Sequence, residues 1–559
     1  MIKKICICFL LLVFFIGCKV KKESPRYPIL LNMVHHNPGE PKFETQYTEP
    51  AFLIEKGYTG QVPKIEIQCA LTYDRWQDNI IPEKSKERLW INRHAAEIEV
   101  LINNAEKAGL PIYPFTDVLV VPQSIIKEFG DEMKLDGKLS IQKERTQEIL
   151  KAQIDEIFWR FPQIAGLTIR FGETYLHDTP FHKGTRPVQT TEDHTLLINI
   201  LKEEICVKRN KKLFYRTWDF GWFHTRPDFY LKATNPVVPH PNLFFSIKHA
   251  NADFLRGYPF NKTIGIGKHQ QIVELSTNQA GCYGKNSHPY YIGKGIIESW
   301  PEMTEKKGIR DLYNDEKIKG FWIWTWGDSW QGPYFGNELW INLNEFVLRN
   351  YILNPKQTEK EIFYNYALHH LNLSETDAGK LRELCLLSTD AVYYGQASKY
   401  FEENDFWIRD WWVRDHYFTA INLNNIVKKN LQEKVLIEKE ANIRIWYKME
   451  KLASEIKMNN QDDQNFLQVS TTYGRIKYEL IEIIWRIQII HAEYNAGTKI
   501  NKVYAQKCIN AYEQKWKEWV QLKKDNPSCP TLYIDDWSEH CGPPFQTSLD
   551  KLKNLIQNI

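Results

Sequence analysis

Between residues 28 and 324 the sequence repeats one pattern: a short apolar run followed by a longer amphipathic segment. A short apolar run is typical of a strand that is buried on both faces, and an amphipathic segment is typical of a helix that covers a sheet. Strands that alternate with helices predict a parallel sheet, because each helix carries the chain back to the edge where the next strand begins. We expect eight strands, at 28–33, 64–71, 112–115, 166–171, 213–217, 243–247, 272–275 and 320–324.

Polar or aromatic residues follow nearly every one of these runs. A closed (β/α)8 barrel keeps its chemistry at the carboxyl ends of its strands, so this placement favours a barrel. The alternative, an open doubly wound sheet, would carry a glycine-rich phosphate turn, but Gly265-Ile266-Gly267 lacks the third glycine and the following helix. The sequence therefore predicts an α/β fold with a (β/α)8 TIM barrel at 28–350, whose helices include 87–108, 141–159 and 194–206.

After Asn354-Pro355 the strand pattern ends and only helical periods remain. Helices are expected at 359–370, 378–400, 407–429, 435–457, 468–492 and 503–523, so residues 351–559 are predicted to form an all-α C-terminal domain. Trp407, Trp411 and Phe418 share one helix face, which favours a place in the core or at the domain interface. Residues 527–544 are expected to be irregular.

The N-terminus has the features of an export signal. Lys3 and Lys4 precede an apolar segment, residues 5–16, that is too short to span a bilayer as a mature helix. Phe15-Ile16-Gly17-Cys18 resembles the lipobox of bacterial lipoproteins, with Phe in place of the usual Leu. We expect a lipoprotein signal peptide at 1–17 and a tether at 18–27 that is lipidated on Cys18. The expected location is the bacterial cell envelope (outer membrane, periplasmic or surface-facing), with the lipid anchor as the only membrane contact.

Composition narrows the choice of partner. A formal charge of +3 over 559 residues gives no basic surplus, so no nucleic-acid partner is expected. The 19 Trp, 28 Tyr and 28 Phe residues supply aromatic faces that suit sugar rings, although a large core also absorbs such residues. Beyond Cys18 the cysteines are scattered and lack C-x-x-C spacing, so we expect no metal, no cofactor and no disulfide scaffold. Whether Cys529 and Cys541 pair, and the oligomeric state, are left open.

Charged residues gather after three of the expected strands. Glu173 follows the fourth, Lys248 and Asp253 follow the sixth, and Glu274 lies at the end of the seventh. Glycoside hydrolysis needs a protonated carboxyl beside the leaving oxygen and a carboxylate on the opposite face, and a barrel supplies these from different strand ends. The candidate catalytic residues are therefore Glu173, Asp253 and Glu274. The alternative is that Lys248 and Asp253 form a structural ion pair and that Glu274 is a solvated strand end.

Basic side chains are expected around the same rim. They favour a substrate that carries negative charge, such as a uronic acid, whereas the alternative is that they only neutralise the carboxylates. Asp74 and Asp117 are as much expected to cap helices as to orient sugar hydroxyls. The candidate substrate-binding residues are Arg170, Arg216, Lys248, His249, Lys268, His269, Trp218, Asp219, Trp326 and Asp328.

Several short segments resemble the family 67 α-glucuronidases. Residues 248–254, Lys-His-Ala-Asn-Ala-Asp-Phe, are similar to the Lys-Asn-Gly-Pro-Ile-Asp-Phe segment of that family. Other segments resemble that family's later strands and its passage into a helical C-terminal domain. They are residues 166–180, 214–216, 259–260 with 268–275, 337–346 and 353–371. The resemblance implies that Glu173 is the general acid and that Asp253 helps to activate water. It also implies that Arg216 and Lys248 hold the carboxylate of the substrate.

The chain departs from that family at three points. Its second base, a Glu in a Gln-Glu-Tyr motif, is missing here, because Gln279 is followed by Ala280-Gly281-Cys282-Tyr283. Glu274 is the nearest carboxylate. Leu176 and His177 stand where a lysine is expected after the acid, and the family's N-terminal β-domain has no counterpart ahead of the first expected strand.

The expected function is that of an exo-acting glycoside hydrolase on an acidic oligosaccharide or polysaccharide fragment, which removes an α-linked uronic acid with inversion. Three alternatives stay open. The first is a retaining glycosidase that uses Glu173 and Glu274, although Gly172 precedes Glu173 where that clan usually has Asn. The second is a non-catalytic glycan-binding surface lipoprotein. The third is a uronate lyase or isomerase, which would want a metal cluster that the sequence does not display.

The lipid anchor depends on one residue and can be tested there. Cys18→Ser is expected to release the protein from the membranes of its native host, because the acylated thiol is the expected attachment point. Membrane fractionation with lipid labelling measures the effect. A variant that stays membrane-bound and lipid-labelled would contradict the lipobox interpretation.

Overall fold

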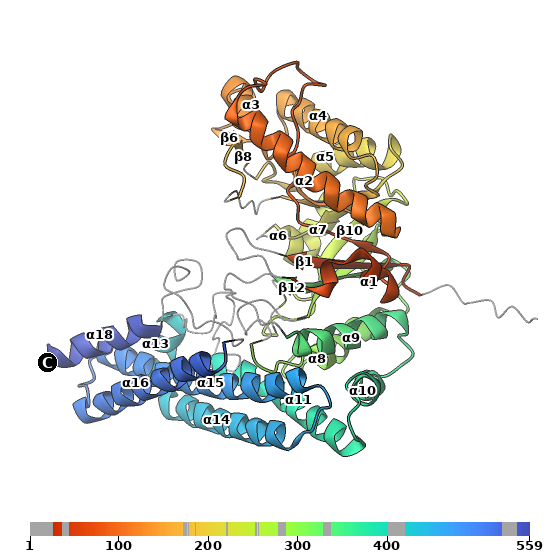
Figure 1. Ribbon diagram of the computed structural model, residues 1–559. Helices are drawn as coiled ribbons and strands as arrows, with labels where there is room; N and C mark the ends of the chain where they lie inside the picture. Colours follow the sequence, from red (N-terminus) through yellow and green to blue (C-terminus); the bar gives the residue numbers. More distant parts are fainter. Residues whose placement is uncertain are drawn as a thin grey trace, which may run out of the picture.

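The chain forms a barrel of strands and helices followed by a bundle of helices (Figure 1). In Figure 1 the barrel is the upper part, coloured red to green, and the blue helices of the C-terminal part lie below it. The computed structural model describes residues 26–35, 44–171, 176, 178–184, 186–219, 222–251, 254, 256–277, 287–327, 337–400, 420–527 and 545–558. No helix among these residues is both long enough and apolar enough to cross a bilayer.

Eight strands form one sheet in the order β2-β1-β12-β11-β10-β9-β7-β3, and every pairing between them is parallel. The sheet curls until its two edge strands meet. Residues Gln61 and Ile112 form a parallel bridge, the amide of Tyr113 donates to the Gln61 carbonyl at 2.9 Å, and that of Phe115 donates to Pro63 at 3.0 Å. The result is a TIM-like barrel. Its strands are β1 Ile29–His35, β2 Gly60–Gln61, β3 Phe115–Asp117, β7 Gly166–Arg170, β9 Lys212–Arg216, β10 Leu243–Lys248, β11 Gln270–Ser276 and β12 Ile318–Gly327.

Helices cover the outside of the sheet, and local sequence signals set their ends. Helix α2 begins after Ser85, whose Oγ accepts from the Arg88 amide, and it ends at Gly109, whose φ of 79° terminates the helix. Helix α5 begins with a capping box of Thr190 and Asp193. The barrel helices are α1 Pro50–Glu55, α2 Lys86–Ala108, α3 Gln123–Phe129, α4 Glu144–Arg160, α5 Thr191–Leu201, α6 Trp222–Thr225, α7 Pro227–Thr234, α8 Gly293–Glu298 and α9 Leu339–Leu353.

Alternate residues of each strand point into the barrel and form a separate core there. This inner core is strongly aromatic, which accounts for part of the aromatic content of the chain. Its members are Ile29, Leu31, Met33, Val62, Tyr113, Phe115, Phe214, Phe244, Phe254, Ile272, Trp322 and Trp324. A side chain is excluded at Gly320, where a Cβ atom would lie 1.9 Å from the Ile29 carbonyl oxygen of the neighbouring strand.

The second strand lies earlier in the chain than the sequence predicted. The predicted strand at 64–71 is wrong, because β2 is Gly60–Gln61 and residues Ile67–Cys69 form a 3-10 turn. Glu66 has φ 47° and ψ 45°, a left-handed conformation that ends the extended backbone. The apolar residues of the 3-10 turn are buried outside the inner core, so their apolar pattern imitates a strand. Lys64 and Glu66, rather than residues 72–76, therefore follow the second strand.

The C-terminal part is helical throughout its described residues. The 35-residue helix α15 packs against α13, α14, α16 and α18 and buries the indole of Trp485. The predicted stripe of Trp407, Trp411 and Phe418 and the segment 528–544 lie outside the described residues. The helices are α10 Glu359–Asn365, α11 Glu375–Gln396, α13 Ala420–Lys428, α14 Gln432–Glu455, α15 Gln461–Asn495, α16 Lys502–Asp525 and α18 Phe545–Gln557.

Arg256 connects the barrel to this helical part. It lies in the segment after β10, is 1% exposed, and forms a bidentate ion pair with Glu302 at 2.7 and 3.0 Å. Its Nη1 donates to the Thr389 carbonyl at 2.7 Å, and its Nη2 donates to Asp390 at 3.0 Å, both on α11. The guanidinium also lies 4.6 Å from the centre of the Trp300 ring. The loop between β10 and β11 is thus held against the helical part at Arg256.

We expect Arg256→Met to destabilise the protein by about 3 kcal/mol, because it leaves the buried Glu302 carboxylate without its partner. Thermal denaturation measures the effect. Arg226→Met is the matched control, since the Arg226–Asp228 pair is exposed on both sides and such pairs contribute about 1 kcal/mol or less. Equal losses in the two variants would contradict the role assigned to Arg256.

Candidate functional site

The carboxyl ends of the barrel strands carry a layer of charged side chains that point inward. Two of them form a bidentate pair: Arg216 Nε and Nη2 donate to Glu274 Oε1 and Oε2, each at 2.9 Å. Ser246 Oγ adds a third hydrogen bond to Oε1 at 2.8 Å. On the neighbouring strands Arg170 makes a second bidentate pair with Asp117. All four ionic side chains are at most 3% exposed.

Phe115 lies between the two arginines. The guanidinium carbon of Arg170 is 4.8 Å from the centre of its ring, and that of Arg216 is 5.0 Å away. Arg216 also lies 5.1 Å from the ring centre of Trp324. Aromatic faces stabilise a guanidinium that has lost water, so the pairs and rings together form a rigid floor for the barrel mouth. Arg216 Nη1 makes no hydrogen bond with any described residue, and it is the part of that guanidinium left for a ligand.

Lys248 lies beside this floor, within a group of aromatic rings. Its Nζ is 3.9 Å from the centre of the Trp218 ring and 4.5 Å from that of Phe254. The His249 ring stacks on the Phe254 ring, with ring centres 6.1 Å apart. The backbone amide of His249 donates to the Glu274 carbonyl at 3.0 Å, which ties the end of β10 to β11. The structure thus places Arg170, Arg216, Trp218, Lys248 and His249 close together at the carboxyl ends of β7, β9 and β10.

Asp219 follows β9 at the same edge and has a partner that the sequence analysis missed. Arg186, from the segment between β7 and α5, donates to Asp219 Oδ2 at 2.9 Å and to the Val188 carbonyl at 3.0 Å. The Asp219 side chain is buried while that of Arg186 is about one third exposed. No sequence pattern marks Arg186, because its role depends on a contact with a residue 33 positions away.

Two more residues were missed because the second strand was misplaced. Lys64 and Glu66 follow β2, and their charged atoms are 3.9 Å apart at the closest. Gln68 Nε2 donates to Glu66 Oε2 at 2.7 Å. Burial and the nearby Asp117 carboxylate raise the pKa of Glu66, while Lys64 and Arg170 oppose the shift. A predicted strand that ended at Gln61 would have placed both residues after it.

Three predicted residues lie elsewhere. Lys268 and His269 precede β11, so they lie at the amino edge of the sheet, and the prediction that they share the rim is wrong. His269 Nε2 contacts the Thr234 carbonyl at 2.9 Å, and burial lowers the pKa of His269. Trp326 belongs to the outer core between sheet and helices, and its indole N–H donates to Glu338 rather than facing the mouth.

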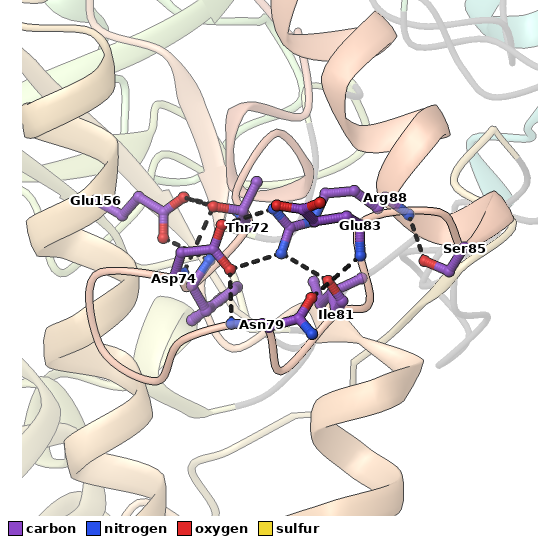
Figure 2. A network of polar contacts seen from close by, with 9 residues as sticks. Thr72, Asp74, Asn79, Ile81, Glu83, Ser85, Arg88 and Glu156 are labelled. Carbon is purple, nitrogen blue, oxygen red and sulfur yellow. Dashed lines mark hydrogen bonds and ion pairs between the residues drawn. The ribbon is translucent and has the colours of Figure 1, made fainter.

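The structure also shows the surroundings of Glu274 and Asp74, for which the sequence left alternative roles open. Glu274 is not a solvated strand end, because it is fully buried against Arg216. Asp74 lies in a network outside the barrel mouth, where both of its oxygens accept from Arg88 at 2.6 Å (Figure 2). In the same network Glu156 accepts from the backbone amides of Thr72 and Tyr73, each at 2.6 Å. Burial raises the pKa of Glu156. This network fixes the loop before α2 and has a structural role.

The remaining candidates are Glu173, Asp253, Asp328 and Cys18, and they lie outside the described residues. Arg170 ends β7 three positions before Glu173, and Lys248 ends β10 five positions before Asp253. The described parts of the chain contain no group of three or more His, Cys, Asp and Glu side chains that could hold a metal ion.

No protein-family model and no curated protein matches the sequence. Among solved structures, a GH138 enzyme described as targeting pectin rhamnogalacturonan II is similar with a TM-score of 0.60 at 11% identity, over 96% of this chain and 68% of that chain. An O-GlcNAc hydrolase mutant of Thermobaculum terrenum has a TM-score of 0.36 at 11% identity, over 95% and 94%. The chitobiase of Flavobacterium johnsoniae has 0.35 at 11%, over 88% and 78%. The first of these glycoside hydrolases shares its fold with this chain. The other two TM-scores are too low to indicate a shared fold.

The two central cations are expected to respond differently to substitution. Arg216→Met should lower the free energy of unfolding by about 3–5 kcal/mol, because it leaves the buried Glu274 carboxylate without its partner. The double change Arg216→Met with Glu274→Gln should recover part of this loss. Lys248→Met should weaken binding of an acidic sugar about tenfold or more, with less effect on its methyl ester. Calorimetry on both sugars measures this, and equal losses on the two would assign Lys248 a structural role.

Proposed function

We propose that the protein is an exo-acting glycoside hydrolase that removes an α-linked uronic acid from an acidic carbohydrate, with inversion. The observation that carries the proposal is the position of Arg216 Nη1 and Lys248 Nζ at the carboxyl end of the barrel. A carboxylate forms its strongest hydrogen bonds with such cations. The aromatic rings beside them suit the apolar face of a sugar.

In this proposal Glu173 protonates the leaving oxygen and Asp253 helps to activate water, as the resemblance to family 67 α-glucuronidases implies. Arg216 and Lys248 hold the carboxylate of the sugar. Glu274 positions Arg216, because three donors occupy its carboxylate and none of its side-chain surface is exposed. The same burial speaks against the retaining alternative, in which the Glu274 carboxylate would have to attack the anomeric carbon.

The GH138 enzyme of similar fold supports the substrate class. It is described as targeting pectin rhamnogalacturonan II, and pectin is itself an acidic carbohydrate. A lipid anchor on Cys18 would hold the enzyme in the cell envelope, where carbohydrate fragments arrive from outside. A panel of uronate-capped oligosaccharides with product detection tests the function. Release of a free uronic acid supports it, and no release from any member would contradict it, whether or not the protein binds the sugars.

Stereochemistry follows from the distance between the two carboxyl groups. A gap of about 6.5–9.5 Å leaves room for water and gives inversion, whereas about 5–5.5 Å gives retention. Because Glu173 and Asp253 follow β7 and β10, which are separated by β9, we expect the wider gap and an inverted product by NMR.

Variants separate the roles of the carboxylates. Glu173→Gln should lower turnover of poor leaving groups by about 10²–10⁴-fold and spare activated aryl glycosides, which need less protonation. Asp253→Asn should abolish both activities. Glu274→Gln should fall between, because it loosens Arg216 without removing an acid or a base. A retained product with a sugar trapped on Glu274 would overturn the assignment.

A further inference from the structure

Glu66 differs from the other described carboxylates of the barrel mouth in having accessible surface. Its side chain is 16% exposed, whereas Asp117 is 3% and Glu274 is 0% exposed. Asp117 and Glu274 each have both oxygens held by an arginine. In Glu66 only Oε2 accepts a hydrogen bond, from Gln68, and Oε1 has Lys64 Nζ at 3.9 Å with no hydrogen bond to it. One oxygen of Glu66 is therefore left for another molecule.

The backbone holds Glu66 in place at an energetic cost. A left-handed conformation costs a residue with a Cβ atom about 1–2 kcal/mol, and such strain persists where the surroundings enforce it. Here the Glu66 carbonyl accepts from the amide of Cys69 at 2.8 Å and contacts His94 Nε2, on α2, at 3.3 Å. Strained residues gather at functional sites, and this one lies at the carboxyl end of a barrel strand.

From this geometry we propose that Glu66 is a further substrate-contacting residue, whose free carboxyl oxygen donates a hydrogen bond to a hydroxyl or ring oxygen of the bound uronic acid. The inference rests on the proposed function and adds a contact from the β2 side of the mouth, opposite in sheet order to Arg216 and Lys248.

The charges around Glu66 favour the protonated carboxyl that such a donor needs. Burial and Asp117 on β3 raise its pKa, against the opposing effects of Lys64 and Arg170 on β7. The other titratable groups that face it among the described residues are His94 on α2 and Cys69 in the 3-10 turn. Because the pKa is raised, the carboxyl keeps its proton to a higher pH than usual and loses it as the pH rises through the folded value. A neutral Glu66 also avoids repelling a uronate.

The test compares the full-length wild type with Glu66→Gln and Glu66→Ala. The substrate is the uronate-capped oligosaccharide that the wild type cleaves best, and the pH range brackets the ordinary Glu value and neutrality. Glu66→Gln should keep most of kcat/KM, since its amide also donates, and should lose the part of the decline at high pH that comes from Glu66, while the part that comes from the general acid Glu173 remains. Glu66→Ala should lose about tenfold in kcat/KM at low pH. Glu97→Gln, on the same side of α2 as His94 and largely exposed, is the matched control and should resemble the wild type.

The outcomes separate this inference from the proposed function. Glu66→Ala with the kcat/KM of the wild type, or Glu66→Gln with the same decline at high pH, would overturn the role of Glu66 while the glycosidase stands. If Glu66→Ala does not fold, as judged by thermal denaturation, the pH profile of Glu66→Gln decides alone. Calorimetry with D-glucuronic acid and D-galacturonic acid is the second readout. A wild type that neither cleaves the panel nor binds these sugars would remove both proposals.

Discussion

Charges buried inside a barrel must be paired, and the arrangement of the mouth follows from this requirement. Removing an ion from water costs several kcal/mol, and only close, well-oriented partners offset the cost. The Arg216–Glu274 and Arg170–Asp117 pairs meet the condition with two hydrogen bonds each, and Phe115 fills the space between their guanidinium groups. These pairs fix the inward side chains of β3, β7, β9 and β11 at one level.

The sequence predicted the longer buried strands well. The expected strands at 28–33, 166–171, 213–217, 243–247 and 272–275 agree with β1, β7, β9, β10 and β11 to within two residues at each end. The second strand failed because apolar residues after Glu66 are buried by tertiary packing in a 3-10 turn, which sequence periodicity does not distinguish from a strand. Because the end of the second strand was misplaced, the sequence analysis missed Lys64 and Glu66 and considered Asp74 instead.

A second limit of sequence reasoning concerns whether a residue comes before or after its strand. Lys268 and His269 are adjacent in sequence to a barrel strand, but they come before it, and parallel strands place such residues at the edge opposite to the site. The pairing of Arg216 with Glu274 spans 58 positions and depends on the register of β9, β10 and β11, which no local pattern encodes. Composition and local pattern thus predict which residues reach the mouth, while register decides which of them neutralise one another.

The helical part contributes to the mouth by holding the loops that surround it. Arg256 fastens the segment after β10 to α11, and the amide of Tyr291, after β11, donates to Ser388 Oγ on α11 at 3.0 Å. Two consecutive barrel loops are therefore anchored to one helix, which lies below the barrel in Figure 1, next to α14 and α15. The first of these loops is held at Arg256, three positions after Asp253 in the sequence. Because α11 holds residues of two barrel loops, we regard the barrel and the helical part as one structural unit.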